Sequence, residues 1–136
     1  MADLIYGNAL SLDLIIPTHN RSKLLKKCLE SVFRAAVPRN FEVKVYVVDN
    51  NSTDDTKAVV ERFAQANYLF VGRAGKSAAL NDALAQTGSA LVGLIDDDET
   101  IDPKWFEVAY QEFSSSPDLD YIGGSCEGDW EKQAPD

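Results

Sequence analysis

An acidic run, Asp96-Asp97-Asp98-Glu99, is the part of the sequence best suited to chemistry. Adjacent carboxylates repel one another, so such a run weakens a fold unless water or a cation compensates it. Mg²⁺ and Mn²⁺ prefer carboxylate oxygens and keep coordination positions open for water or phosphate. In an extended segment Asp96 and Asp98 point the same way and can share a metal ion, while Asp97 faces elsewhere. The alternative is a solvated acidic turn that also caps the following helix.

Asp49 is another acidic residue that directly follows an apolar segment, here Val47-Val48. Acidic residues at the end of a second strand bind a base or ribose in nucleotide-binding folds. An Asx-type turn that leads from Asn50 into a capped helix accounts for the same segment without a ligand. The segment alone does not decide between these interpretations.

Two cations, Arg73 and Lys76, lie among glycines in Gly72-Arg73-Ala74-Gly75-Lys76-Ser77. Gly-Lys-Ser is the tail of a phosphate-binding P-loop, but that motif requires glycine at position 70, where this sequence has Phe70. A P-loop is therefore excluded, although helix amides together with Arg73 or Lys76 can still bind phosphate. Ordinary solvated cations are the alternative.

His19 is the only histidine in the chain, so a histidine-based catalytic triad would have to use it. No serine or cysteine lies in a nucleophile-elbow pattern. A role in stabilising a loop, or in contacting the edge of a ligand, is the better interpretation of His19.

Short apolar segments alternate with segments of helical periodicity, and these elements must position the polar residues. Strands are predicted at residues 12–16, 41–48, 68–71 and 90–95, with the start of a fifth at residues 121–124. Helices are predicted after residue 20, after residue 52, from residue 75 to near residue 88, and from residue 102. Asn20 is expected to cap the first helix, Ser52 and Asp55 to form a capping box for the second, and Asp102-Pro103 to begin the fourth.

This alternation predicts the fold class, which is α/β and Rossmann-like: a largely parallel sheet flanked by helices on both faces. In such open sheets, ligands bind beyond the carboxyl ends of the strands. The segments at residues 17–21, 49–52 and 96–99 each follow a predicted strand. We therefore expect these three segments to converge at one edge of the sheet, although they are far apart in the sequence.

Length, charge and cysteine usage restrict the classes of function. The 136 residues predict one domain, residues 1–136, and the net charge of −9 without a basic run disfavours nucleic-acid binding. Cys28 and Cys126 lie in no metal-binding or redox pattern, so both are predicted to be reduced, buried thiols. No signal peptide and no apolar stretch of ~18 residues is found. A cytoplasmic location is predicted, and a peripheral membrane role is left open.

Four segments, residues 15–21, 47–54, 75–81 and 95–99, stand in the order and spacing of one protein family. Through them the chain resembles the N-terminal, nucleotide-binding half of family 2 glycosyltransferases, which are inverting enzymes of the GT-A fold. The resemblance covers residues 12–130 and extends to Gly123-Gly124 and to Trp130-Glu131. Each motif alone is common, whereas the four in register are specific.

The resemblance implies a nucleotide-diphospho-sugar donor, with a UDP-sugar favoured, and a Mn²⁺ or Mg²⁺ ion. Asp96 and Asp98 correspond to a D-x-D pair in which Asp98 is the more direct metal ligand, and Asp49 corresponds to the acid that hydrogen-bonds the base. The nucleotide-binding positions that it implies are Pro17, Thr18, His19, Asn20, Arg21, Asp49, Asn51, Lys76, Asp96 and Asp97.

The resemblance stops where family members continue with a further half that supplies the acceptor site and a catalytic carboxylate base. No residue here matches that base, and the role cannot be assigned to Asp118, Asp120, Glu127, Asp129 or Glu131. We therefore expect an incomplete domain that is inactive in isolation. It would be the donor-binding part of a glycosyltransferase with an unknown glycan, lipid or protein acceptor. A sheet edge left bare in this way is a surface through which two copies could associate.

Two other functions compete with this expectation. The first is a non-catalytic nucleotide-binding or partner-binding module, which the missing half favours. The second is a nucleotidyltransferase, which would make nucleotide-sugars rather than consume them. Nucleotidyltransferases usually carry a glycine-rich basic loop after the first strand, and residues 17–21 contain no glycine, so this function is the least favoured.

Overall fold

A computed structural model describes residues 10–129, which contain four strands and four helices in alternating order. The strands are β1 (Leu10–Thr18), β2 (Phe41–Asp49), β3 (Ala66–Phe70) and β4 (Leu91–Leu94). The helices are α1 (Ser22–Arg34), α2 (Thr56–Glu61), α3 (Lys76–Leu84) and α4 (Trp105–Ser115). The alternation of strands and helices predicted from the sequence is confirmed.

All four strands are parallel and lie in the order β3-β2-β1-β4, with the two longest strands in the centre. β1 pairs with β2 along its whole length, from Leu10 opposite Phe41 to Thr18 opposite Asp49. This register places the end of β1 beside the end of β2. β4 lies at an edge of the described sheet, where Leu94 is 58% exposed.

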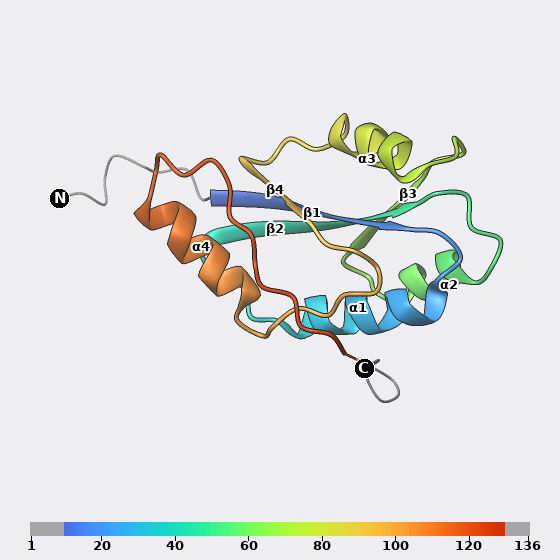
Figure 1. The fold of residues 1–136 in the computed structure, drawn as a ribbon, viewed down its shortest axis with the longest axis horizontal. Coiled ribbons are helices and arrows are strands. Elements are labelled where there is room, and N and C mark those ends of the chain that lie inside the picture. The colour runs from blue at the N-terminus through green and yellow to red at the C-terminus, as the bar shows by residue number, and fades with distance from the viewer. Residues whose placement is uncertain (1–9, 130–136) are drawn as a thin grey trace.

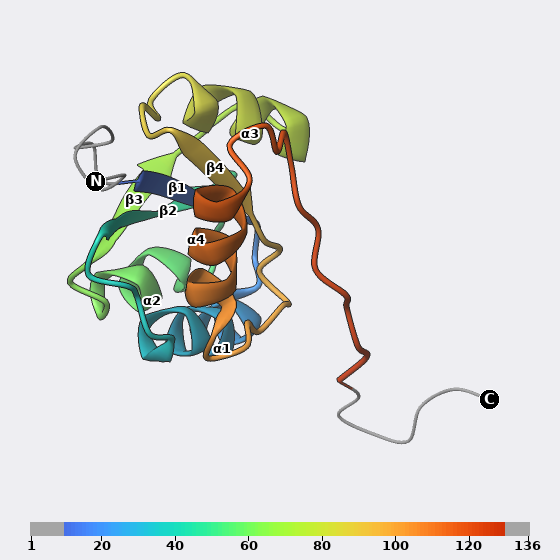
Figure 2. The same cartoon turned by 90° about the vertical axis from the view of Figure 1, so that its left-hand side faces the viewer.

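Helices cover both faces of the sheet, as Figure 1 and Figure 2 show. α3 lies on one face, and α1, α2 and α4 lie on the other. Because neighbouring side chains of a strand point to opposite faces, β1 contributes to a core on each side. Leu14 packs in the core that contains Phe106 of α4, and Ile15 packs in the core that contains Ala79 and Ala83 of α3. The α/β fold class predicted from the sequence is confirmed.

The fifth strand predicted at residues 121–124 is wrong. Within the described residues, this segment is extended but forms no strand, and Tyr121 is 83% exposed. No neighbouring strand covers the apolar side chains there, so the apolar pattern alone does not produce pairing. Trp130 and Glu131 lie outside the described residues.

Two predicted helix boundaries are also shifted. α3 ends at Leu84 instead of near Gly88, and α4 begins at Trp105 instead of at Asp102-Pro103. The carboxylate of Asp102 accepts the amide of Lys104 at 2.8 Å, so Asp102 caps a turn that precedes the regular helix. None of the helices within residues 10–129 combines the length and the hydrophobicity needed to cross a membrane.

Asp13 is a buried carboxylate in the middle of β1. It accepts hydrogen bonds from the amide of Gly88 at 2.9 Å, and from the amide and hydroxyl of Ser89 at 3.0 and 2.8 Å. Burial by itself would raise the pKa of this carboxyl, but the bonds from Ser89 and Gly88, with help from Lys44, hold the pKa below its usual range. Asp13 therefore anchors the loop between α3 and β4 to the central strand.

Replacing Asp13 by Asn should lower the free energy of unfolding at pH 7 by about 2 kcal/mol, because the charge-assisted hydrogen bonds from Gly88 and Ser89 become weaker bonds to a neutral amide. A lowered native pKa gives stabilisation that is complete above the unfolded pKa of about 3.9 and is lost as the pH falls through the native pKa. Urea unfolding of both chains at pH 7 and pH 3 measures this. The difference should shrink at pH 3, and an equal difference at both pH values would contradict the assignment.

Candidate functional site

The loops that follow β1, β2 and β4 are in contact at one edge of the sheet. The hydroxyl of Thr18 donates to Asp97 at 2.8 Å, across 79 positions of the sequence. His19 Nδ1 donates to the carbonyl of Asn50 at 2.7 Å. The convergence predicted for residues 17–21, 49–52 and 96–99 is therefore confirmed.

His19 lies between two asparagines and joins the first loop to the second. Its Nε2 is 3.3 Å from Asn20 Nδ2, which can only donate, so the neutral ring with its hydrogen on Nδ1 satisfies both contacts. The ring thus acts as a donor to Asn50 and an acceptor from Asn20, which is a loop-stabilising arrangement.

Asn20 connects the β1–α1 loop to the β2–α2 loop. Its Oδ1 accepts hydrogen bonds from the backbone amides of Thr53 at 2.7 Å and Asp54 at 3.3 Å. Its own backbone amide donates to Ser52 Oγ at 2.9 Å. Asn20 has a φ of 50°, a left-handed conformation that asparagine adopts more readily than most residues. Its backbone and side chain therefore both serve the contact between the loops.

The capping roles predicted for Asn20 and for Ser52 with Asp55 are wrong. Arg21 occupies the N-cap of α1 and Asp55 that of α2, and neither makes a side-chain cap bond. The amide of Ser22 at the start of α1 instead donates to Asp54 of the neighbouring loop at 3.1 Å. The polar side chains that the local sequence pattern assigns to helix caps instead form hydrogen bonds between the two loops.

Replacing Asn20 by Gly should lower the free energy of unfolding by about 1 kcal/mol, because glycine keeps the left-handed backbone but removes the acceptor for Thr53 and Asp54. Asn51 is the matched control, since it is exposed and also left-handed, with a φ of 61°. Asn51→Gly should change stability by less than about 0.5 kcal/mol. Equal losses in the two variants, measured by urea unfolding, would show that the bonds of Asn20 are not the cause.

Asn50 connects β2 to the loop before α3, a role that the sequence reasoning missed. Its Nδ2 donates to the carbonyls of Val71 at 3.2 Å and Arg73 at 2.5 Å, and its Oδ1 accepts the amide of Gly75 at 3.0 Å. Gly75 has a φ of 112°, which only glycine adopts without strain. The signal available in the sequence was the unbroken polar run that follows Val48.

Asp49 ends β2 and is buried with both carboxylate oxygens bonded. Oδ1 accepts the amide of Ser52 at 2.9 Å, and Oδ2 accepts the hydroxyl of Tyr68 at 2.7 Å. Burial and the bond to Asp49 raise the pKa of Tyr68 above its usual range, so Tyr68 remains a donor to Asp49. The turn interpretation of Asp49 is present in the structure, and each oxygen keeps a second lone pair for a ligand.

The three aspartates of the acidic run differ in environment. Asp97 is buried, and it accepts from Thr18 and, at 3.2 Å, from Arg21 Nη1. Asp98 is exposed and lies 3.3 Å from the same Arg21 nitrogen. Asp96 forms an ion pair with Lys76. The run therefore presents two solvent-accessible carboxylates on either side of one structural carboxylate.

Lys76 is the cation that reaches the acidic run from α3. Arg73, in the loop before α3, instead forms an ion pair with Asp82 of that helix at 2.6 Å. Of the two cations singled out in the glycine-rich segment, the structure thus brings only Lys76 to the site.

Pro17 and Asn51 occupy less central positions: Pro17 is buried within β1, and Asn51 is exposed in the β2–α2 loop.

The two cysteines differ from one another. Cys28 is buried behind the acidic run, where its Sγ donates to the carbonyl of Asp96 at 3.7 Å. Burial and then the charges of Asp97, Glu99 and Asp98 raise the pKa of Cys28 to about 12, so the thiol stays protonated and unreactive. Cys126 is exposed, so its predicted burial is wrong.

Within residues 10–129, no group of three or more His, Cys, Asp and Glu side chains is arranged to hold a metal ion by itself. The chemistry of the accessible donors does fit Mn²⁺ or Mg²⁺, because Asp96 and Asp98 supply carboxylate oxygens. Each already binds the cationic group of Lys76 or Arg21, which shows that this run attracts positive charge. Further ligands would have to come from water or from a bound phosphate.

A separate apolar hollow of about 420 Å³ lies between the end of α1 and the start of β2. It is lined by Val32, Phe33, Ala35, Val37, Phe41, Val43, Val45, Gln65 and Phe106. None of the predicted site residues lines it, and it offers no charged group for a nucleotide. The polar edge is therefore the better candidate site.

The polar edge and the parallel sheet agree with a comparison to protein families. Residues 13–132 match the model of glycosyl transferase family 2. The chain belongs to glycosyl transferase family 2. This confirms the resemblance stated from the four sequence motifs.

Individual relatives support the same assignment. Glycosyltransferase AglE of Haloferax volcanii is 30% identical over 118 residues, which cover 83% of this chain and 38% of AglE. Staphylococcus aureus TarS in complex with UDP-GlcNAc superimposes with a TM-score of 0.70 at 27% identity, covering 79% of this chain and 32% of that one. The chain thus spans about a third of the length of each of these two relatives.

A third relative carries a metal. The mannosyltransferase PcManGT of Pyrobaculum calidifontis, in complex with GDP-Man and Mn²⁺, superimposes with a TM-score of 0.69 at 28% identity, covering 76% of this chain and 32% of that one. The family and the GT-A fold are established for this chain.

Proposed function

We propose that this chain is the donor-binding part of an inverting glycosyltransferase. Its donor would be a nucleotide-diphospho-sugar, with a UDP-sugar favoured, and its acceptor a glycan, lipid or protein. One observation carries the proposal: the loops after β1, β2 and β4 are bonded into one polar edge that presents two accessible carboxylates, Asp96 and Asp98. The relatives bound to UDP-GlcNAc and to GDP-Man with Mn²⁺ support it.

The nucleoside is expected to bind where the first two loops meet. Asp49 has acceptor lone pairs for the base, and the bonds of Asn20 and Asn50 hold the surrounding backbone in place. Because these bonds lie within the protein and need no ligand atom, little conformational entropy would be lost when the nucleotide binds. His19 and Thr18 complete this side of the proposed site, and Pro17 supports it from within β1.

Asp98, assisted by Asp96, would hold a Mn²⁺ or Mg²⁺ ion. When bound, the ion supplies charge neutralisation for the diphosphate that leaves. Lys76 and Arg21 lie on either side of these carboxylates and can bind phosphate oxygens by charge-assisted hydrogen bonds. Asp97 keeps the loop in place through its bond to Thr18.

In the complete reaction, the acceptor hydroxyl oxygen forms a bond to the anomeric carbon while the bond to the diphosphate oxygen breaks. The hydroxyl proton passes to a carboxylate base, and the anomeric centre is inverted because this is a single displacement. No residue of this chain is assigned to that base. The relatives are about three times longer than the segment matched here, so a base from outside this segment is consistent with the comparison.

Calorimetric titration with UDP and GDP, each with and without Mn²⁺ or Mg²⁺, tests the proposal. We expect UDP to bind more tightly than GDP and only when the metal is present. The proposal is wrong if neither nucleotide binds to the folded chain, or if the nucleotide binds with the same affinity with and without the metal.

A further inference from the structure

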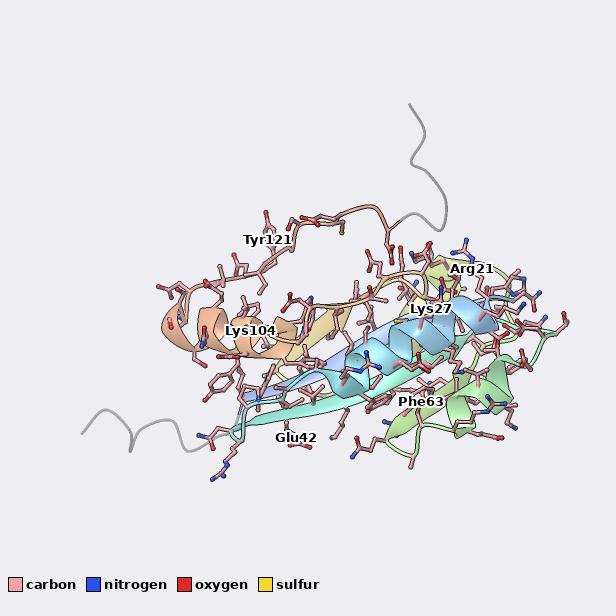
Figure 3. The ribbon with its side chains drawn as sticks, turned by 90° about the horizontal axis from the view of Figure 1, so that it is seen from below. Arg21, Lys27, Glu42, Phe63, Lys104 and Tyr121 are labelled. Atoms are coloured by element: carbon pink, nitrogen blue, oxygen red, sulfur yellow. The ribbon has the colours of Figure 1, made fainter. Side chains whose placement is uncertain are left out.

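Both cations of the proposed site are bound to the acidic run. Arg21 Nη1 lies 3.2 Å from Asp97 and 3.3 Å from Asp98, and Lys76 forms an ion pair with Asp96. The two cations come from different elements, since Arg21 precedes α1 and Lys76 begins α3. Figure 3 shows Arg21 at one end of the molecule. The protein's own cations therefore pair with the two carboxylates that are proposed to bind the metal.

These ion pairs are loosely held. The side chains of Arg21 and Asp98 are 52% and 49% exposed, and those of Lys76 and Asp96 are similarly accessible. Exposed pairs of this kind are worth between about 0 and 1 kcal/mol, so another ion can displace them. Asp97 differs because it is buried and bonded to Thr18, which keeps Arg21 at the edge when Asp98 is taken by another ion.

We propose that Arg21 and Lys76 are exchangeable internal counter-ions. They neutralise Asp98 and Asp96 in the free protein, and they transfer to the donor diphosphate when a divalent metal takes over those carboxylates. The inference rests on the proposed function and extends it, because it predicts that metal and nucleotide bind cooperatively and names the residues responsible.

The cooperativity follows from the charges. A metal ion that binds alone must displace Arg21 from Asp98 and Lys76 from Asp96, and the metal then repels both cations. A diphosphate that binds alone must approach four consecutive acidic residues, and the nearby cations Arg21 and Lys76 are already paired with two of them. When both bind, the metal neutralises the carboxylates of Asp96 and Asp98, and the phosphates neutralise the cations that the metal has released. Each ligand therefore raises the affinity for the other by the same factor.

Binding of Mn²⁺, followed by the relaxation enhancement of water protons with and without UDP, measures this factor. In the unmodified chain, UDP should raise the affinity for Mn²⁺ by about 10- to 100-fold. In Arg21→Gln, the affinity for Mn²⁺ alone should rise about threefold, because a competitor is removed. The affinity for Mn²⁺ in the presence of UDP should fall, so the coupling factor drops about tenfold. Lys76→Met should behave in the same direction.

Arg39→Gln is the matched control, because Arg39 is an exposed arginine just before β2, at the opposite end of the sheet. It removes the same charge and should leave the coupling factor unchanged. The inference is overturned if Arg21→Gln binds Mn²⁺ alone no more tightly than Arg39→Gln, or if the coupling factor is equal in both. Failure of the unmodified chain to bind UDP with Mn²⁺ would instead overturn the proposed function, and this inference with it.

Discussion

Replacing Asp98 by Asn should weaken the Mn²⁺-dependent binding of UDP by about a hundredfold. Loss of a residue that only supports a metal ligand lowers metal affinity by about 10- to 100-fold. We therefore expect a loss of about 100-fold when a direct ligand is removed. Asp98 is exposed, and its hydrogen bond to Arg21 is to a side chain that is itself half exposed. The free energy of unfolding should therefore change by less than about 0.5 kcal/mol. Calorimetry for binding and urea unfolding for stability measure the two effects separately.

Glu42→Gln is a suitable control for Asp98→Asn. Glu42 is an exposed acid near the start of β2, and Figure 3 shows it far from Arg21. The variant removes the same charge from the opposite end of the sheet, so it should bind UDP with Mn²⁺ as the unmodified chain does. Equal affinities for Asp98→Asn and Glu42→Gln would exclude Asp98 as the metal ligand.

Replacing Asp49 by Ala should lower the free energy of unfolding by about 3 kcal/mol. The carboxylate is buried, and its removal leaves the amide of Ser52 and the hydroxyl of Tyr68 without their acceptor. Tyr68→Phe removes one of these two bonds together with its donor, so it should cost only about 1 kcal/mol. Urea unfolding of the two variants tests the difference, and equal losses would show that Asp49 does not organise this turn.

A conservative variant of Asp49 separates its structural role from the proposed contact with the base. Asp49→Asn keeps the shape and an acceptor for Ser52, and the Tyr68 hydroxyl can rotate to accept from the new amide. If Asp49 binds the base, this variant should lose about tenfold in affinity for UDP, while Tyr68→Phe loses less than about twofold. If both variants bind UDP as the unmodified chain does, Asp49 is a structural residue alone.

The sheet and its polar edge could be predicted because their signals are local. Two apolar strands end abruptly in acidic residues, at Val48 before Asp49 and at Ile95 before Asp96. In a parallel sheet these junctions must meet at one edge, so the convergence followed without knowledge of any contact. The resemblance to the family added the roles of particular residues, which the local signals alone left undecided.

The contacts between loops could not be predicted, because the same residue types serve caps and cross-loop bonds equally well. Asn20 and Ser52 carry the chemistry of helix caps, yet each bonds to the loop opposite, and only the register of β1 with β2 makes that partner available. The pairing of Arg21 with Asp97 and Asp98 spans 76 and 77 positions, beyond any local pattern. The fifth strand failed for the converse reason, since the pattern at residues 121–124 is local but no neighbour pairs with it.

The most direct test of the account is a crystal structure of the chain with UDP and Mn²⁺, with the metal located by its anomalous scattering. The account predicts one strong peak at the carboxyl edge of the sheet, within bonding distance of Asp98 and of a diphosphate oxygen, with the uracil beside Asp49. A peak away from the acidic run, or UDP bound at this edge without the metal, would contradict it.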